Sequence, residues 1–534
     1  MNELVEAIKR QPSLPRFLCH IYQRLKQQRL NLVAGAGISI DSGVPSWLGL
    51  LESLTEHSET LKEDLDAHRK SGLSPEYLGQ IIYHRHRHDN DSGTEDMKGD
   101  ATINYGWAEA IHGAIYKDVT TDIEQLVSDH PYLGQLRDLT RKVPMVINFN
   151  FDDILAQAVG KQITEDGKGN SFSVEWRPTI MDRKDHTTIY HVNGLLPQVS
   201  LKKRSPKLIF TEDSFTDAIA RSPGMSADYL LMRFIQNTML IIGHSLGDAS
   251  LKNYLRQNKD KSPANHHYMI YWIPASGGLS GSRQSDIFEA NLELYNLITV
   301  FLTSDEINEF LSVLNKDERD FIDFLESVGG DKRACYCYYI AGPVAAGKSS
   351  LLEHLRCFET YEEWTRPPPK EMYLSFNKLT PEETNMVDGF IYSELKEKNR
   401  RLSRAEIGFH FMDRAPLDLY AFSKDEAENK EKTVKLQRLV VNNKRLQDGE
   451  ILFIYAKGET LVERNYSRGR RPEDAGSALY YDDQSNGLKK IYSPTFCLDT
   501  NSHTAGQVAK KVVRHVLLGK YSPVDLNAVM ERYK

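Results

Sequence analysis

Four short segments of the first half place polar or glycine residues directly after apolar runs. They are Gly35–Ser39 (GAGIS), Asn148–Asp153 (NFNFDD), Tyr190–Gly194 (YHVNG) and Ile242–Asp248 (IGHSLGD). Glycines let backbone N–H groups approach a phosphate, and histidine exchanges protons near neutral pH. Amide and carboxylate side chains can orient water or a hydroxyl group for such an exchange. These residue types indicate a site that binds a phosphorylated ligand and performs acid–base chemistry.

The second half contains a complete phosphate-binding loop. The apolar run at 335–341 leads into GPVAAGKSS, which fits the pattern GxxxxGK[ST] between a strand and a helix. In such a loop backbone N–H groups surround the phosphates, Lys348 reaches the β- and γ-phosphates, and Ser349 holds Mg²⁺. The alternative is a glycine-rich turn without a ligand. We expect ATP or another nucleotide with Mg²⁺ at Gly342, Gly347, Lys348, Ser349 and Ser350.

Elements of alternating type must position these residues. Runs rich in valine, isoleucine and aromatic residues alternate with longer helical stretches, which is typical of a parallel α/β sheet. In the first half we expect strands at 31–36, 144–149, 187–192, 207–210, 238–243 and 267–274. In the second half we expect them at 335–341, 371–375, 450–456 and 494–498. The polar segments then lie at carboxyl ends of strands, where open α/β sheets bind ligands.

A change of pattern divides the chain. A charged helical stretch ends in two glycines, and a new strand with its own glycine-rich loop follows. The predicted domains are 1–310 and 334–534, joined by a linker helix at 311–333. The predicted fold class is α/β, with a Rossmann-like parallel sheet in the first domain and a P-loop α/β fold in the second.

Composition excludes several protein classes. A length of 534 residues exceeds what one hydrophobic core supports, and a net charge of −7 disfavours a general nucleic-acid binder. No apolar run approaches 18 residues, and the start of the chain has no signal-peptide pattern. We therefore expect a soluble, cytoplasmic protein that does not use a membrane.

Cysteine spacing argues against a metal or disulfide framework. The five cysteines form no CxxC pair, so no zinc quartet and no disulfide scaffold are predicted. Cys335 and Cys337 alternate along an apolar run, which favours a buried strand.

Taken in order, the motifs GAGIS, SGVPSW, NFNFDD, HVNG and GHSLGD resemble the sirtuin family, over about residues 25–300. More narrowly, they resemble the sirtuin-like NAD hydrolase domains of bacterial anti-phage defence proteins. The resemblance implies NAD as substrate and a catalytic set of Asn150, Asp152 and His191. It implies that NAD is held by Gly35, Ala36, Gly37 and Ser39 at the pyrophosphate and by Gly243, Ser245 and Asp248 on the adenosine side.

Two departures from the family distinguish hydrolysis from deacylation. The four-cysteine zinc module of deacylating sirtuins is absent, and Phe149 stands where deacylases tend to have glutamine. Both favour cleavage of NAD to nicotinamide and ADP-ribose, linear or cyclised. The structural alternative is that Asn150 and Asp152 form a polar turn and that His191 makes an ordinary core contact.

The second half resembles the deoxynucleoside kinase and thymidylate kinase group. The resemblance rests on the P-loop and on YEEW at 361–364, FMDR at 411–414 and the arginine-rich RNYSRGRR at 464–471. It implies a nucleotide site that also includes Glu363, Asp413, Arg414, Arg464, Arg468 and Arg470. Guanidinium groups pair with phosphate oxygens, although an exposed basic surface is the alternative for the arginine run. The segment 365–410 lacks the landmarks of active kinases, so phosphate transfer and mere sensing both stay open.

The two halves together predict a gated enzyme. Unrestrained NAD hydrolysis would kill the cell, so we expect an anti-phage effector whose second half senses a nucleoside or nucleotide. We expect a homo-oligomer, and a phage-derived trigger is one candidate ligand. The alternatives are a metabolic bifunctional nucleoside kinase with an NAD-processing domain, and a non-catalytic binder of ADP-ribose or nucleotides. Whether the ligand activates or restrains, and which trigger acts, stay open.

Overall fold

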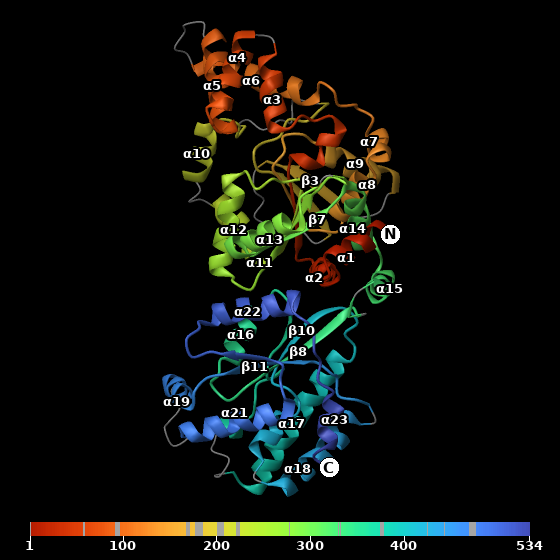
Figure 1. The fold of residues 1–534 in the computed structure, drawn as a ribbon, viewed down its shortest axis with the longest axis vertical. Coiled ribbons are helices and arrows are strands. Elements are labelled where there is room, and N and C mark those ends of the chain that lie inside the picture. The colour runs from red at the N-terminus through yellow and green to blue at the C-terminus, as the bar shows by residue number, and fades with distance from the viewer. Residues whose placement is uncertain are drawn as a thin grey trace. The chain divides into compact units, whose positions relative to one another are not determined.

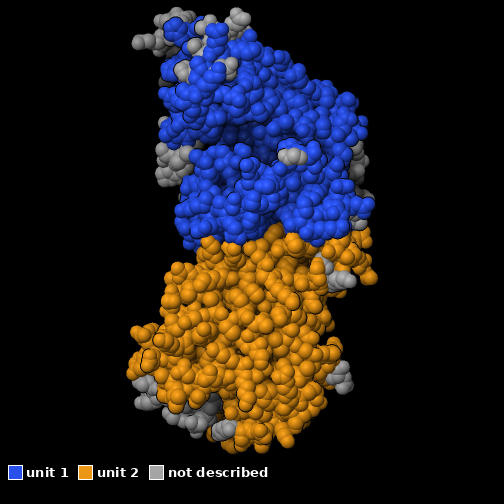
Figure 2. Space-filling model, viewed as in Figure 1, with its two compact units in different colours: residues 1–11, 24–261, 266–317 blue, residues 12–23, 262–265, 318–534 orange. Residues whose placement is uncertain are grey.

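The computed structural model describes most of the chain in two compact units (Figure 1, Figure 2). The described residues are 2–56, 59–90, 97–166, 171–176, 185–199, 208–220, 225–276, 278–328, 330–331, 333–373, 379–423, 425–442, 444–468 and 477–534. Unit 1 comprises residues 1–11, 24–261 and 266–317, and unit 2 comprises residues 12–23, 262–265 and 318–534. The predicted domain limits stay predictions.

Unit 1 is built on a seven-stranded parallel sheet with the order β3-β4-β2-β1-β5-β6-β7. Its strands are β1 (Leu30–Ala34), β2 (Met145–Asn148), β3 (Ser171–Glu175), β4 (His186–His191), β5 (Thr238–Ile242), β6 (His267–Trp272) and β7 (Leu297–Leu302). Every residue of β1, β2, β5 and β7 is buried. Uniform burial is expected for β1, β2 and β5, which are inner strands of a parallel sheet that is covered on both faces, whereas β7 is buried although it lies at the edge.

Some helices of unit 1 pack around this sheet, and several of those between β1 and β2 form a separate group beside it (Figure 1). The helices of unit 1 are α1 (Asn2–Arg10), α3 (Trp47–Thr55), α4 (Glu59–Lys70), α5 (Pro75–Asn90), α6 (Met97–Tyr116), α7 (Ile123–Asp129), α8 (Pro131–Thr140), α9 (Ile154–Asp166), α10 (Glu212–Ala220), α11 (Met225–Gln236), α12 (Ala249–Lys261), α13 (Gly281–Tyr295) and α14 (Ser304–Asn315). The short 3₁₀ helices η1 (Ala36–Ile38) and η2 (Ile40–Ser42) follow β1.

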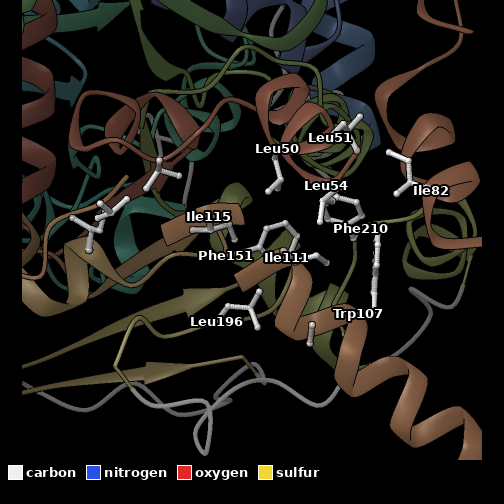
Figure 3. Packing of buried hydrophobic residues seen from close by; sticks show 14 of the residues in the cluster. Leu50, Leu51, Leu54, Ile82, Trp107, Ile111, Ile115, Phe151, Leu196 and Phe210 are labelled. Atoms are coloured by element: carbon white, nitrogen blue, oxygen red, sulfur yellow. The ribbon is translucent and has the colours of Figure 1, made fainter. Parts of the chain in front are cut away.

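The helical segment between β1 and β2 has a core of its own. Leu50, Ile111 and Phe210 are buried together there, and Phe151 from the NFNFDD segment packs among them (Figure 3). Phe149, two residues earlier, belongs instead to the core that includes Val33 of β1. The two phenylalanines are thus anchored in different cores, which holds the backbone of Asn150 between them.

Five of the six strands predicted for the first half are confirmed within one or two residues of each end. The strand predicted at 207–210 is wrong, because residues 208–210 have no regular structure and residue 207 lies outside the described ranges. Phe210 is buried in the core of the helical segment between β1 and β2, so its burial does not require a strand. The sequence prediction missed β3 and β7.

Unit 2 has a five-stranded parallel sheet with the order β12-β11-β8-β10-β9. Its strands are β8 (Cys335–Ala341), β9 (Glu359–Tyr361), β10 (Gly408–Asp413), β11 (Glu450–Tyr455) and β12 (Phe496–Asp499). Its helices are α15 (Glu318–Val328), α16 (Lys348–His354), α17 (Pro381–Leu402), α18 (Glu426–Leu436), α19 (Gly458–Ser467), α21 (Ala478–Tyr492), α22 (Ala505–Leu518) and α23 (Leu526–Glu531). The α/β fold class with two parallel sheets is confirmed.

Unit 2 also includes a piece of the N-terminal region. Residues 12–23, most of helix α2 (Leu14–Lys26), belong to it. The Gln23 side chain donates to the carbonyl of Phe409 (3.2 Å) and accepts from its N–H (3.0 Å). A Cβ atom on Gly408 would lie 2.5 Å from the Gln23 amide carbon, so a glycine at the start of β10 lets the amide approach. Nothing in the local sequence of α2 indicates this role.

Three strands predicted for the second half are found, and β8 has the predicted bounds. The strand predicted at 371–375 is wrong, because residues Lys370–Tyr373 form a 3₁₀ helix. Residues 374 and 375 lie outside the described ranges. The sequence prediction missed β9 and β10.

The five cysteines are free thiols, and Cys337 is buried in β8 as expected. Within the described ranges, no group of three or more His, Cys, Asp or Glu side chains is arranged to hold a metal ion. Among the helices described, none is long and apolar enough to cross a bilayer.

Candidate functional sites

The polar segments of unit 1 meet at one edge of the sheet because their strands end in register. Ala34 at the end of β1 pairs with Asn148 of β2 and with Ile242 of β5, and Asn148 pairs with His191 of β4. The four candidate segments therefore begin side by side at the carboxyl edge. This is the place where open parallel sheets bind ligands.

The glycine-rich loop after β1 is pressed against the loop after β5. Gly35 N–H donates to the carbonyl of Ile242 (3.0 Å), and Gly37 N–H donates to that of Gly243 (2.8 Å). Gly243 has a left-handed φ of 68°, and a Cβ there would lie 2.6 Å from the nitrogen of Ile38. Ala36 begins η1 between the two glycines. The packing brings the two predicted NAD-binding loops together.

This close packing makes a stability prediction for Gly35. A Cβ at Gly35 would lie 2.5 Å from the carbonyl oxygen of Gly243, a backbone atom that cannot move away cheaply. We expect Gly35→Ala to lower the free energy of unfolding by about 1–3 kcal/mol, measured by urea denaturation. The control is Gly113→Ala in α6, where a Cβ meets nothing within 4 Å. That change should stabilise by roughly 0.5–1 kcal/mol, and an equal effect of both changes would contradict the packing argument.

Asn150, Ser39 and Asp152 form one buried polar network. Asn150 Nδ2 donates to the carbonyl of Gly35 (3.1 Å) and lies 3.4 Å from Ser39 Oγ. Ser39 Oγ donates to Asp152 Oδ1 (3.0 Å), which also accepts from the N–H of Ile154 (3.2 Å). Burial raises the pKa of Asp152 to about 6. The turn contacts expected under the structural alternative are present, and they tie the predicted catalytic residues to the glycine loop.

The raised pKa of Asp152 makes stability depend on pH. Between about pH 4 and 6 the unfolded chain loses the Asp152 proton while the folded chain keeps it, so ionisation of Asp152 destabilises the fold as pH rises. Asp152→Asn removes this titration and keeps an oxygen that can accept from Ser39. Relative to the parent chain, the variant should gain roughly 2 kcal/mol in free energy of unfolding between pH 4 and 6.5.

Urea denaturation of both proteins at the two pH values measures this difference. The pKa of His191 is about 4 in the folded chain, so its titration raises the free energy of unfolding as pH rises. This contribution is the same in both proteins and cancels in the difference between them. A stability difference that is the same at both pH values would contradict the assignment.

His191 is held as a neutral base. Its Nδ1 lies 2.8 Å from the carbonyl oxygen of Asn150. A carbonyl only accepts, so Nδ1 carries the proton and Nε2 keeps its lone pair. Nε2 is buried and has no hydrogen-bond partner in the part of the chain that the structure describes, and burial lowers the pKa of His191 to about 4. The ring is therefore neutral at pH 7 with one basic nitrogen free to accept a proton.

The loop after β5 contributes two predicted residues in different ways. Ser245 is exposed at the loop surface. Asp248 Oδ1 accepts from the N–H of Leu251 (2.9 Å), one of the unpaired donors at the start of α12, and burial raises the pKa of Asp248. Asp248 therefore caps a helix in this structure, and its predicted contact with NAD stays a prediction.

Sequence reasoning missed Asp153, whose side chain anchors the NFNFDD segment. Asp153 Oδ1 accepts from Tyr116 hydroxyl (3.1 Å), Gln157 Nε2 (2.8 Å) and Gln198 N–H (3.1 Å). Tyr116 also donates to the carbonyl of Leu196 (2.8 Å). The second aspartate of NFNFDD was the only available signal, because Tyr116 and Gln198 lie far along the chain and only Gln157 is a sequence neighbour.

The comparison with protein families supports this site. Residues 144–297 match the SIR2-like domain family. The SIR2-like segment contains Asn150, Asp152, His191 and the loop after β5, whereas the glycine loop at 35–39 precedes it. A SIR2-like domain indicates an activity related to NAD. No curated protein matches the chain.

The P-loop of unit 2 has the expected strand–loop–helix setting. It joins β8 to α16, and Gly342, Ala345 and Gly347 have φ values of 153°, 64° and 99°. A Cβ on Gly342 would collide with the carbonyl of Ile454. Lys348 Nζ donates to the carbonyls of Gly342 (2.9 Å) and Pro343 (2.8 Å). Burial and the nearby Arg414 lower the pKa of Lys348 to about 8.

Acidic and basic side chains gather at the end of β10 beside the P-loop. Ser349 Oγ donates to Asp413 Oδ2 (2.9 Å), and Asp413 Oδ1 is buried without a partner among the residues that the structure describes. Arg414 forms an ion pair with Glu363. Lys398 of α17, which the sequence prediction missed, donates to the Asp413 carbonyl (3.2 Å). Its only sequence signal was a basic position in a polar helix.

The hydroxyl and the adjoining carboxylate suit a hard divalent cation. Mg²⁺ prefers oxygen ligands and binds beside nucleotide phosphates. Ser349 Oγ together with the unpartnered Asp413 Oδ1 provides such oxygens next to the P-loop. The residues present therefore fit a Mg²⁺–nucleotide complex.

The three predicted arginines of the RNYSRGRR segment differ in what the structure shows of their surroundings. Arg464 donates to the side chain and carbonyl of Thr500 (3.0 and 2.7 Å), and Thr500 Oγ1 in turn donates to the P-loop carbonyl of Ala346 (3.2 Å). Arg468 lines a cavity of about 310 Å³ beside the P-loop, whose lining also includes Ser350, Arg464 and His503. Arg470 lies outside the described residues. A nucleotide on the P-loop can extend into this cavity.

Two solved structures are similar to parts of this chain. One is deoxyadenosine kinase from M. mycoides with bound dATP, at 18% identity and a TM-score of 0.27, covering 33% of this chain and 96% of that one. The other is NadR protein in complex with NAD and AMP-PNP, at 10% identity and a TM-score of 0.26, covering 71% and 89%. Such TM-scores do not by themselves establish a common fold. The P-loop geometry of unit 2 stands on the described residues.

Proposed function

We propose that unit 1 hydrolyses NAD to nicotinamide and ADP-ribose. The observation that carries this proposal is the neutral His191 ring at the carboxyl edge of the SIR2-like sheet, whose Nδ1 donates to the Asn150 carbonyl and whose buried Nε2 has no partner among the described residues. A buried base without a partner is unfavourable for folding, so a ligand hydroxyl is its natural partner.

The reaction balances with water as the acceptor. The bond between nicotinamide and ribose breaks, nicotinamide leaves with the electron pair, and a water oxygen bonds to the ribose carbon. The water proton is released, and His191 Nε2 is the group placed to accept a proton from water or a ribose hydroxyl. Asn150 orients that oxygen, and the glycine loop places its backbone beside the pyrophosphate, with Gly35 N–H and Gly37 N–H already engaged by the loop after β5.

The products distinguish this proposal from deacylation. Purified protein incubated with NAD should release nicotinamide and ADP-ribose, linear or cyclised, with no acyl-lysine peptide present. Chromatography with mass detection identifies the products. Release that requires an acetylated peptide and yields an acetylated ribose would overturn hydrolysis in favour of deacylation.

For unit 2 we propose nucleotide sensing that gates NAD cleavage in an anti-phage effector. The P-loop, the Ser349–Asp413 pair and the adjacent cavity support a Mg²⁺–nucleotide site. A cytoplasmic enzyme that consumes NAD without restraint would exhaust its host, so a ligand-dependent control is expected. Homo-oligomerisation is part of the same proposal.

One experiment tests both units. Nicotinamide release is measured with NAD against a panel of nucleosides and nucleotides. Release that depends on one member of the panel supports gating. Ligand-independent release with steady phosphorylation of a nucleoside would favour a metabolic bifunctional enzyme. Intact NAD under every condition would favour a binding regulator.

A further inference from the structure

Lys398 of α17 is a buried lysine to which the proposed nucleotide site gives no role. Its side chain is almost fully enclosed, with the residue 3% exposed. Nζ donates to the carbonyl oxygen of Asp413 (3.2 Å) and lies 6.0 Å from the ring centre of Trp364. An ammonium group has three N–H donors, and this carbonyl takes one of them. No carboxylate forms an ion pair with Lys398 in the part of the chain that the structure describes.

The P-loop lysine is in the same state. Lys348 is 7% exposed, and its Nζ donates to the backbone carbonyls of Gly342 and Pro343. Within the described ranges it forms no ion pair with a carboxylate either. A buried charge without a partner of opposite sign is unfavourable, and for a P-loop lysine the nucleotide phosphates provide that partner. Lys398 has the same need for an anion.

The carboxylates around Lys398 do not meet this need, because each has another partner. Burial lowers the pKa of Lys398 to about 8, so most of the ammonium stays charged at pH 7. The nearby charges are the carboxylates of Asp413, Glu363 and Glu394, which oppose this decrease, and Arg414, which adds to it. The carboxylates are engaged by other side chains: Glu363 by Arg414, Glu394 by Arg366 (3.0 Å), and Asp413 by Ser349 (2.9 Å).

Asp413 connects Lys398 with the P-loop. Its carbonyl accepts from Lys398, while its side chain accepts from Ser349, the residue that follows Lys348. The Lys398 ammonium therefore lies one residue away from the oxygens that suit Mg²⁺ and the nucleotide phosphates.

We infer that Lys398 is a second phosphate-binding cation of unit 2, which donates to a phosphate oxygen at the end of β10. The inference rests on the nucleotide site proposed for unit 2. The oxygen belongs to the terminal phosphate of the P-loop nucleotide or to a second ligand that carries a phosphate, such as a nucleoside monophosphate. Both sources offer an anionic oxygen, with which an ammonium group forms a strong hydrogen bond.

Calorimetric titration of the full chain distinguishes the two sources. The first arm compares ADP with AMP-PNP, both with Mg²⁺, because the two differ by the terminal phosphate. The second arm adds AMP, dAMP, dCMP or dTMP to the protein saturated with Mg²⁺ and ADP, and repeats this with the corresponding nucleosides.

Two variants separate the charge from the contact with the carbonyl. Lys398→Met keeps the apolar stem and removes the charge, while Lys398→Gln also removes the charge but keeps a donor for the Asp413 carbonyl. Both should weaken binding of AMP-PNP or of a monophosphate by about tenfold and leave binding of ADP and of the nucleosides unchanged. A loss for AMP-PNP identifies the terminal phosphate, and a loss for a monophosphate identifies a second ligand.

The matched control is Lys396→Met, which changes an exposed lysine of the same helix and should bind every ligand like the parent chain. Thermal unfolding of each variant checks the fold. If the methionine variant does not fold, the glutamine variant makes the same comparison.

Three results would overturn the role of Lys398 while the nucleotide site stands. They are unchanged binding of every ligand in both variants, an equal loss for ADP, and a loss in the methionine variant that glutamine restores. The second would show a general disturbance of the site, and the third would show that only the contact with the Asp413 carbonyl matters. A parent chain that binds neither ADP nor AMP-PNP would overturn the proposed nucleotide site together with this inference.

Discussion

Replacing His191 by alanine should lower the rate of nicotinamide release by about 10²–10⁴-fold, the usual contribution of a general base. The ring offers Nε2 as a neutral base and holds this state through the Asn150 carbonyl. Asn150→Ala should have a comparable effect, because the amide links the glycine loop to the Ser39–Asp152 pair. Nicotinamide release under saturating NAD measures both.

The control for this prediction is His84→Ala, an exposed histidine of α5, which should keep full activity. Asn150 follows β2 and His191 is the last residue of β4, and both side chains are buried. Circular dichroism and thermal unfolding therefore check that each variant is folded. A His191→Ala protein that is folded and nearly fully active would show that another group is the base.

Replacing Lys348 by alanine should weaken nucleotide binding to unit 2 by about 10- to 100-fold. The ammonium group lies at the P-loop, where it donates to loop carbonyls, and we expect it to donate to bound phosphates; a hydrogen bond from a charged donor is stronger than one from a neutral donor. Calorimetric titration with Mg²⁺ and a non-hydrolysable ATP analogue measures the loss. Lys430→Ala on the exposed face of α18 is the matched control.

The same variant tests gating of unit 1. If the nucleotide is a trigger, which we expect because infection commonly adds nucleotides, Lys348→Ala should blunt the activation of nicotinamide release. If the nucleotide is a brake, the variant should release activity without a ligand. Identical responses of Lys348→Ala and the parent chain across the ligand panel would show that the units are uncoupled. The metabolic bifunctional enzyme would then be the better account.

Apolar runs in the sequence predicted most strands. The prediction failed where an apolar residue is buried outside a strand, or where polar residues interrupt a strand and find partners only in the folded sheet. The run 335–341 was predicted with the right bounds because seven apolar residues precede a glycine-rich loop. β10 was missed because its own pattern is interrupted by Gly408 and His410. His410 is satisfied by Tyr361 of β9 (3.1 Å) and by the carbonyl of Ile407 (2.9 Å). Those partners exist only once the sheet has formed.

The sequence by itself determined that glycines, asparagine and histidine follow apolar runs in unit 1, and that a P-loop with Lys348 and Ser349 opens unit 2. These features are local, because a strand, a tight loop and a helix start are all encoded within about ten residues. Motif spacing along the chain does not reveal which strands are neighbours. That information lies in long-range packing.

Only the tertiary structure decided that β4, β2, β1 and β5 are adjacent and end in register, which brings Asn150, His191 and the two glycine loops together. It also decided the proton position on His191, because the backbone carbonyl of Asn150 can only accept from Nδ1. That choice depends on an atom that is distant in sequence. The residue types therefore determine which chemistry the site can perform, but the fold determines the protonation state of its histidine.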